Sequence, residues 1–311
     1  MILVIESVAP VFLLIVLGYA LRRKHFLSEG FWEGADQLTY FVLFPALILH
    51  TLTGADLAYL SISGMALALA SPVLLVAVTL SLVRAKFKSW GHDGPAYTSL
   101  FQGAIRPNTF MGLAAAASLY GEAGLALAAV AVVVLTPMVN LLSASTLARH
   151  ASKEHTVAKD QVLLIATNPL ILASLAGVIL NLGGIDLPAL AVPLFDTLGR
   201  GAMTLGLLSV GAGLSPMAAR SDESSSLSTL IVSCTAKLVL LPLLTATFLH
   251  LFAVQGMTAA IAILFAALPT SATAYVMARQ LGGDHTLMAR IITVETLAAT
   301  CTLPACLILL S

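Results

Sequence analysis

The sequence predicts an all-α polytopic membrane protein of ten transmembrane helices, arranged as two inverted five-helix repeats. Three observations predict this fold class. The 311 residues are 59% hydrophobic and 10% charged, with a mean hydropathy of +0.99, whereas soluble domains average about 25% charged residues. The hydrophobic residues fall into runs of the length that spans a bilayer, about 20 residues. Landmark residues of the first half also recur, in the same order, in the second half.

Ten apolar runs are expected to form the spanning helices. They lie at 7–21, 35–53, 62–83, 97–119, 123–144, 162–182, 195–214, 227–252, 257–281 and 287–310. The first run is expected to be retained, because no basic residue precedes it as one would in a cleaved signal. Residues 1–147 form the first repeat, 148–161 a short cytoplasmic linker and 162–311 the second repeat, which leaves no soluble domain.

Matching landmarks support a duplication. Pro10 and Gly18 in the first run correspond to Pro169 and Gly177 in the sixth, and each glycine stands eight positions after its proline. Single matches between leucine-rich helices carry little weight. Several matches in the same order indicate two related halves.

The fourth and ninth runs are predicted to be broken helices. They read QGAIRPNTFMGLAAAASLYG over 102–121 and LFAALPTSATAYVMARQLGG over 264–283, and Pro107 and Pro269 each stand fourteen positions before the final glycine. Proline has no N–H and collides with the carbonyl four residues earlier. Backbone groups freed in this way persist at membrane depth only where protein or a water-lined cavity satisfies them. Paired breaks in two halves are the best sequence indication of a secondary transporter's binding site.

Basic residues gather at alternate connections between the runs. Twelve of the fifteen lie there: Arg22, Arg23, Lys24, Arg84, Lys86, Lys88, Arg149, Lys153, Lys159, Arg220, Arg279 and Arg290. The other connections and both termini contain none, so the positive-inside rule places both chain ends outside the cytoplasm. Because five is an odd number of helices, the second half enters the membrane in the opposite orientation.

The remaining basic residues and one acid lie within the runs. Arg106, Lys237 and Glu295 are expected near mid-depth, and Arg200 nearer the outer surface. A charge at the bilayer centre costs about 2.5–3.5 kcal/mol on the insertion scale, so such residues usually face the protein interior and carry function. Arg106 has two interpretations, a substrate contact or a permanent structural partner of an acid or of freed carbonyls. Lys237 and Glu295 form either a structural ion pair or a coupling site in which Glu295 carries a proton.

A binding site is expected where the two breaks meet. A half-helix that begins after a proline exposes unpaired N–H groups and about half a positive charge, which favours an anion. The guanidinium of Arg106 matches a carboxylate in shape and charge. The predicted substrate contacts are Arg106, Pro107, Asn108, Thr109, Pro269, Thr270 and Ser271.

Other signals exclude several classes of site. Cys234, Cys301 and Cys306 all lie in apolar runs, where small core residues are expected rather than disulfides or zinc ligands. His50, His250 and His285 lie at predicted helix ends, and the chain contains no metalloprotease, Walker or dinucleotide motif. We therefore expect no enzyme, no metal, no cofactor and no nucleic-acid partner. The glycines of the seventh run, namely Gly199, Gly201, Gly206, Gly211 and Gly213, predict either close helix contact or a surface on which a bundle slides.

Four segments together resemble the auxin efflux carrier family, which includes bacterial malonate and malate permeases and the plant PIN-formed auxin exporters. They are APVFLLIVLGYALRR, LTYFVLFPALILHTL, RPNTFMGL followed by LYGEAG, and LPTSATAYVMA followed by GG, and the resemblance covers essentially the whole chain. It implies a bile-acid-symporter-like, NhaA-like fold. Helices one, two, six and seven would be a dimerising scaffold, and helices three to five and eight to ten a transport domain that moves like an elevator.

The family's crossover motif matches this sequence in part. Its proline and asparagine correspond to Pro107 and Asn108, and its second proline to Pro269, where Thr270 follows in place of an asparagine. The long hydrophilic loop of the plant exporters is absent, since only residues 148–161 connect the halves. Regulation through such a loop is therefore not expected.

We expect an inner-membrane secondary carrier for a small organic anion, a mono- or dicarboxylate, that works as a homodimer. Protons or sodium are candidate coupling ions, although an inside-negative potential by itself favours anion export. A cation/proton antiporter that uses Glu295 is the alternative within transport. A membrane sensor that binds its ligand without moving it is the alternative from another class.

Overall fold

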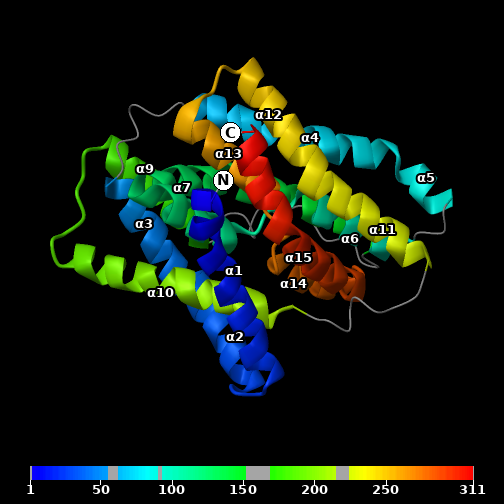
Figure 1. Cartoon of the computed structure of the whole chain (residues 1–311), viewed down its shortest axis with the longest axis horizontal. Coiled ribbons are helices and arrows are strands. Elements are labelled where there is room, and N and C mark those ends of the chain that lie inside the picture. The colour runs from blue at the N-terminus through cyan, green and yellow to red at the C-terminus, as the bar shows by residue number, and fades with distance from the viewer. Residues whose placement is uncertain (1, 55–61, 90–92, 152–168, 215–223, 311) are drawn as a thin grey trace.

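The computed structural model describes residues 2–54, 62–89, 93–151, 169–214 and 224–310, and every regular element in these ranges is a helix. Figure 1 shows the helices packed into one body. All ten predicted runs coincide with helix wherever they are described. The linker beyond Ala151 and the predicted cytoplasmic residues Lys153, Lys159 and Arg220 lie outside the described residues, as do positions 162–168 of the sixth run.

The first half of the chain follows the predicted order. Its elements are α1 (Ile2–Arg23), α2 (Glu29–Leu38), η1 (Thr39–Leu43), α3 (Phe44–Gly54), α4 (Ile62–Leu82), α5 (Arg84–Ser89), α6 (Gly94–Ile105) and α7 (Thr109–His150). Asp93 caps α6, because its side chain accepts from the backbone N–H of Ala96 at 2.8 Å. Gly121 divides α7 into two helices, since its backbone has φ 60° and ψ −149°, which non-glycine residues rarely adopt. The turn separates the fourth and fifth predicted runs where expected.

The second half mirrors this order. Its elements are α9 (Pro169–Leu182), α10 (Ala191–Ala212), α11 (Ser224–Thr235), η4 (Ala236–Leu240), α12 (Leu241–Leu251), α13 (Gly256–Ala267), α14 (Thr273–Gln280) and α15 (His285–Leu310). In Figure 1, α11 and α12 continue each other through η4. The turn after α14 has its positive φ of 79° at Gly282, one residue before the glycine aligned with Gly121.

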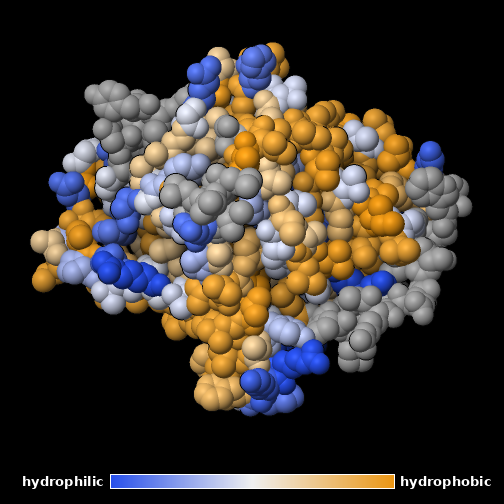
Figure 2. All heavy atoms as spheres, viewed as in Figure 1, coloured by the Kyte–Doolittle hydropathy of each residue, from blue (hydrophilic) through white to orange (hydrophobic). Residues whose placement is uncertain are grey.

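The surface and the helix lengths identify a multi-pass membrane protein. Five helical stretches among the described residues are long and apolar enough to cross a bilayer: Gly30–Gly54, Ser63–Leu82, Thr109–His150, Leu227–Leu251 and His285–Leu310. Figure 2 shows hydrophobic side chains over the region where Figure 1 places α4, α11 and α12. The full set of ten spans and their inverted repeat stay a prediction.

Two π-helical segments interrupt otherwise regular helices, and the sequence analysis did not predict them. Each precedes a proline by two residues: η1 ends at Leu43 before Pro45, and η4 ends at Leu240 before Pro242. A proline inside a helix cannot donate to the carbonyl four residues earlier and collides with it. That carbonyl lies inside the π segment in both cases, so widening the helix to the i→i+5 pattern removes the collision. Such segments are frequent at functional sites.

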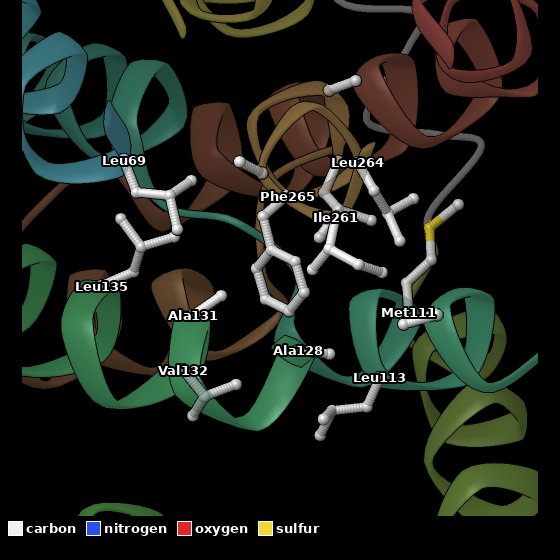
Figure 3. Close-up of a cluster of buried hydrophobic side chains, with 14 of the residues drawn as sticks. Leu69, Met111, Leu113, Ala128, Ala131, Val132, Leu135, Ile261, Leu264 and Phe265 are labelled. Carbon is white, nitrogen blue, oxygen red and sulfur yellow. The ribbon is translucent and has the colours of Figure 1, made fainter. Parts of the chain in front are cut away.

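The helices form two packed groups. In the first group α1 packs on α10, and α3 packs on α9 and α10. In the second, α4 packs on α12, α6 on α11, and α13 on α15. Helix α7 contacts members of both groups, and Figure 3 shows Phe265 of α13 pointing toward Ala128 and Ala131 on the second half of α7.

Three of the five glycines of the seventh run make the predicted close contacts, all within the first group. A Cβ on Gly211 would overlap the backbone of α1, and a Cβ on Gly199 or Gly206 would lie 2.7 or 2.9 Å from side chains of α3. Gly201 and Gly213 have only ordinary contacts.

Two predictions about single residues are wrong. Arg290 was assigned to a connection, but it lies inside α15 and is 5% exposed. Cys301 was expected in the core, but it is exposed on α15. In a membrane protein an apolar run has a face toward lipid, so position in such a run does not imply burial.

Candidate functional site

The two broken helices cross and touch at their breaks. Helix α6 ends at Ile105 and α7 begins at Thr109, while α13 ends at Ala267 and α14 begins at Thr273. Pro107 and Thr270 form an antiparallel backbone bridge, and the N–H of Asn108 donates to the carbonyl of Pro269 at 2.8 Å. The prolines predicted from the sequence therefore lie side by side at one crossing.

The first break has one freed carbonyl, and the second break satisfies it. Pro107 has no N–H to donate to the carbonyl of Gly103, four residues earlier. The hydroxyl of Thr270 donates to that carbonyl instead, at 2.6 Å, and Thr270 is fully buried. Thr270 thus joins the breaks structurally, and its hydroxyl is already engaged.

Two charged side chains replace the interrupted hydrogen bond of the second break. In an unbroken helix the N–H of Thr270 would donate to the carbonyl of Ala266. Here that N–H donates to Glu295 Oε2 at 3.0 Å, and Lys237 Nζ donates to the Ala266 carbonyl at 3.3 Å. Ser233 Oγ donates to the other oxygen, Glu295 Oε1, at 3.0 Å. The two side chains therefore bracket one broken backbone hydrogen bond.

This arrangement corrects the predicted direct ion pair. Lys237 and Glu295 are 1% and 0% exposed. Among the described residues, however, no ion pair of 4.0 Å or less joins them. Each charge is stabilised chiefly by backbone groups at the break, which explains why both residues lie on helices that flank it.

Arg106 caps the end of α6 and points toward α14. Its Nη2 donates to Thr273 Oγ1 at 3.0 Å, its Nη1 contacts Met277 Sδ at 3.4 Å, and its Nε is buried without a partner. The residue is 5% exposed, and Tyr40 on η1 belongs to its electrostatic surroundings. No ion pair joins Arg106 to an acid of the described residues, and the predicted structural role as partner of an acid is absent there. A buried guanidinium with neutral partners is strongly suited to an anion.

Asn108 lies at the positive end of the first half of α7. Its Oδ1 accepts from the N–H of Met111 at 3.2 Å, which makes Asn108 the N-cap, and its Nδ2 is buried without a partner. Thr109 follows and is partly exposed. The unpaired amide and the helix N-terminus place hydrogen-bond donors beside Arg106.

The second break presents a different geometry from the one predicted. Helix α14 begins four residues after Pro269 and contains eight residues. Ser271 lies between them, with its Oγ 2.9 Å from Thr273 Oγ1, and it is partly exposed. Since Thr273 also contacts Arg106, Ser271 reaches the arginine through one intermediate side chain.

The crossing thus gathers the predicted residues but divides their tasks. Thr270, Lys237 and Glu295 hold backbone groups, whereas Arg106, Asn108, Thr109 and Ser271 surround the side with unpaired or partly exposed groups. Thr273, Met277 and Tyr40 were not predicted. A proline two residues after a π segment was the available signal for Tyr40, and only the fold brings the other two to Arg106. The described residues contain no group of three or more His, Cys, Asp or Glu side chains placed to hold a metal.

Comparison with known proteins covers nearly the whole chain. A family model described as "Membrane transport protein" matches residues 3–307. No curated protein matches the chain.

Proposed function

The chain belongs to the auxin efflux carrier family of membrane transport proteins, and we propose that it is a secondary carrier for a small organic anion. The substrate would be a mono- or dicarboxylate that binds at the crossing of the two broken helices. The inner membrane is the proposed location, with both termini outside the cytoplasm.

One observation carries the proposal: the buried guanidinium of Arg106 has no acidic partner among the described residues and retains an unpaired Nε. An isolated buried cation is costly unless an opposite charge compensates it. A substrate carboxylate would supply that charge and accept two parallel N–H bonds. Asn108 Nδ2 and the N-terminus of α7 would donate to the same carboxylate.

Alternating access would follow from movement of one helix group against the other. The proposed scaffold is α1, α2, η1, α3, α9 and α10, and the proposed transport bundle is α4 to α7 with α11 to α15. The packing of α1 on α10 and of α3 on α9 supports the first unit. Phe110, two residues after the crossover asparagine, stacks on Phe44 of α3 with ring centroids 4.3 Å apart. An elevator motion would have to separate these rings, and a homodimer would hold the scaffold fixed.

The bracket around the second break bears on coupling. Glu295 already accepts two hydrogen bonds from protein groups, and Lys237 already donates to a carbonyl. These contacts support a positioning role and make the cation/proton antiporter the second candidate. Proton or sodium coupling of anion uptake stays a proposal to be tested with ion gradients.

Transport by purified protein in liposomes tests the function. Uptake of labelled carboxylates would be measured for the wild type, Arg106→Gln and the matched control Arg200→Gln. Arg200 is paired with Asp196 at 2.9 Å, and its side chain is 77% exposed. We expect Arg106→Gln to lower uptake at least tenfold while Arg200→Gln leaves it unchanged. Equal uptake by all three proteins would refute the proposed site.

A further inference from the structure

Unpaired polar atoms of the described core concentrate on one short stretch. Gln102 leaves both its side-chain nitrogen and oxygen without a partner, Arg106 its Nε, and Asn108 its Nδ2. These are four of the twelve such atoms in the described residues, and they come from seven consecutive positions. Folded proteins leave few buried polar atoms unpaired, so this concentration requires an explanation.

Gln102 faces the same side of α6 as Arg106. The two residues are four positions apart, and the backbone N–H of Arg106 donates to the carbonyl of Gln102 at 3.0 Å, as in a regular helical turn. Thr98, four positions before Gln102, lies against Gly283, just after α14. Arg106 contacts Thr273 and hence α14 itself. Because the neighbours on both sides of Gln102 along this face meet the α14 segment, Gln102 faces α14 between them.

The spacing defines what a ligand at both residues would look like. Side chains four apart on a helix have Cβ atoms about 5–6 Å apart. The guanidinium of Arg106 takes a carboxylate, whereas a primary amide offers a neutral donor and a neutral acceptor. A hydroxyl group, which both donates and accepts, is the complement of that amide.

We propose that Gln102 is a second substrate contact and that the substrate is a short hydroxy monocarboxylate. Its carboxylate binds Arg106, and its hydroxyl, two carbons farther along, exchanges hydrogen bonds with the Gln102 amide. This inference rests on the proposed anion-carrier function and narrows its substrate class. The groups identified on this face offer one positive charge, so a second carboxylate would lie buried against an uncharged amide, which is unfavourable.

Replacement of Gln102 by methionine separates a substrate contact from a structural one. Methionine is close to glutamine in size and has no unpaired amide to bury. Removing a buried group that has no partner stabilises a fold, whereas removing a bonded group destabilises it. We therefore expect Gln102→Met to raise the melting temperature of the substrate-free protein. Thr51→Val in α3 is the matched control, because Thr51 is 6% exposed and its hydroxyl is also unpaired; it should raise the melting temperature without changing transport.

Transport in liposomes is then compared for 3-hydroxybutyrate, butyrate and succinate. We expect the wild type to prefer 3-hydroxybutyrate at least tenfold in kcat/KM. Gln102→Met should reduce that substrate to the level of butyrate and leave butyrate unchanged.

Three outcomes would overturn the inference. A fall in melting temperature with equal loss of all three substrates would make Gln102 structural. A preference for butyrate or succinate that still depends on Arg106 would overturn this inference and leave the anion-carrier function standing. Uptake of none of the three, together with no effect of any carboxylate on the melting temperature, would overturn both.

Discussion

Replacing Lys237 and Glu295 singly and together tests whether they act as one bracket on the second break. Lys237→Met leaves the Ala266 carbonyl without its donor and Glu295 without its cationic neighbour. Glu295→Met leaves the N–H of Thr270 without an acceptor and Lys237 without its acidic neighbour. Losing one member of a buried charged pair costs about 3–5 kcal/mol of unfolding free energy. The two single losses would add to about 6–10 kcal/mol if they were independent.

The double variant is expected to lose much less. With both charges removed, the N–H of Thr270 and the carbonyl of Ala266 can bond each other as in a regular helix. The remaining loss is chiefly the Ser233 hydrogen bond and imperfect packing, about 1–3 kcal/mol. The coupling free energy between the two positions should therefore be at least about 3 kcal/mol.

Denaturant unfolding in detergent, followed by circular dichroism, measures the four free energies of this cycle. Arg200→Gln and Asp196→Asn supply a control cycle on an exposed pair one helical turn apart, where no measurable coupling is expected. Additivity of the Lys237 and Glu295 variants within about 0.5 kcal/mol would refute the bracket.

Two further substitutions test the contacts that hold the crossing and the first helix group. Thr270→Val keeps the shape of the side chain but leaves the carbonyl of Gly103 unpaired, which should cost about 1–3 kcal/mol; Thr247→Val, whose hydroxyl bonds its own helix, should change the unfolding free energy little in the same denaturant experiment. Gly211→Ala should lower the melting temperature because its Cβ would overlap the α1 backbone, whereas Gly34→Ala, with open space around its Cβ, should raise it slightly; a reversed order would contradict the close packing of α1 on α10.

Local chemistry explains which parts of the fold the sequence predicted. The positions of Pro107, Pro269 and Gly121 follow from the missing proline N–H and from the positive φ that glycine tolerates, so the breaks and the turn were readable in advance. The π segments depend on the same proline chemistry, but the sequence analysis treated Pro45 and Pro242 only as possible kinks. The collision of each proline with the carbonyl four residues earlier was the missed indication.

The partners at the crossing were not readable, because they join residues far apart in the chain. Thr270 donates to Gly103 across 167 positions, and Arg106 donates to Thr273 across the same separation. The sequence placed Lys237 and Glu295 near one depth and predicted a direct pair. It could not show that a broken backbone hydrogen bond lies between their binding partners.

The asymmetry of the two breaks indicates which of them meets the substrate. At the second break, Lys237 and Glu295 satisfy the separated N–H and carbonyl, so a ligand there would have to displace bonds that already exist. At the first break, Thr270 satisfies the freed carbonyl, but the donors of Arg106 and Asn108 remain in excess. A ligand that brings only acceptors complements such an excess without breaking a protein hydrogen bond. The first break is therefore the side on which an anion gains most, and the second break is the support that keeps it in position.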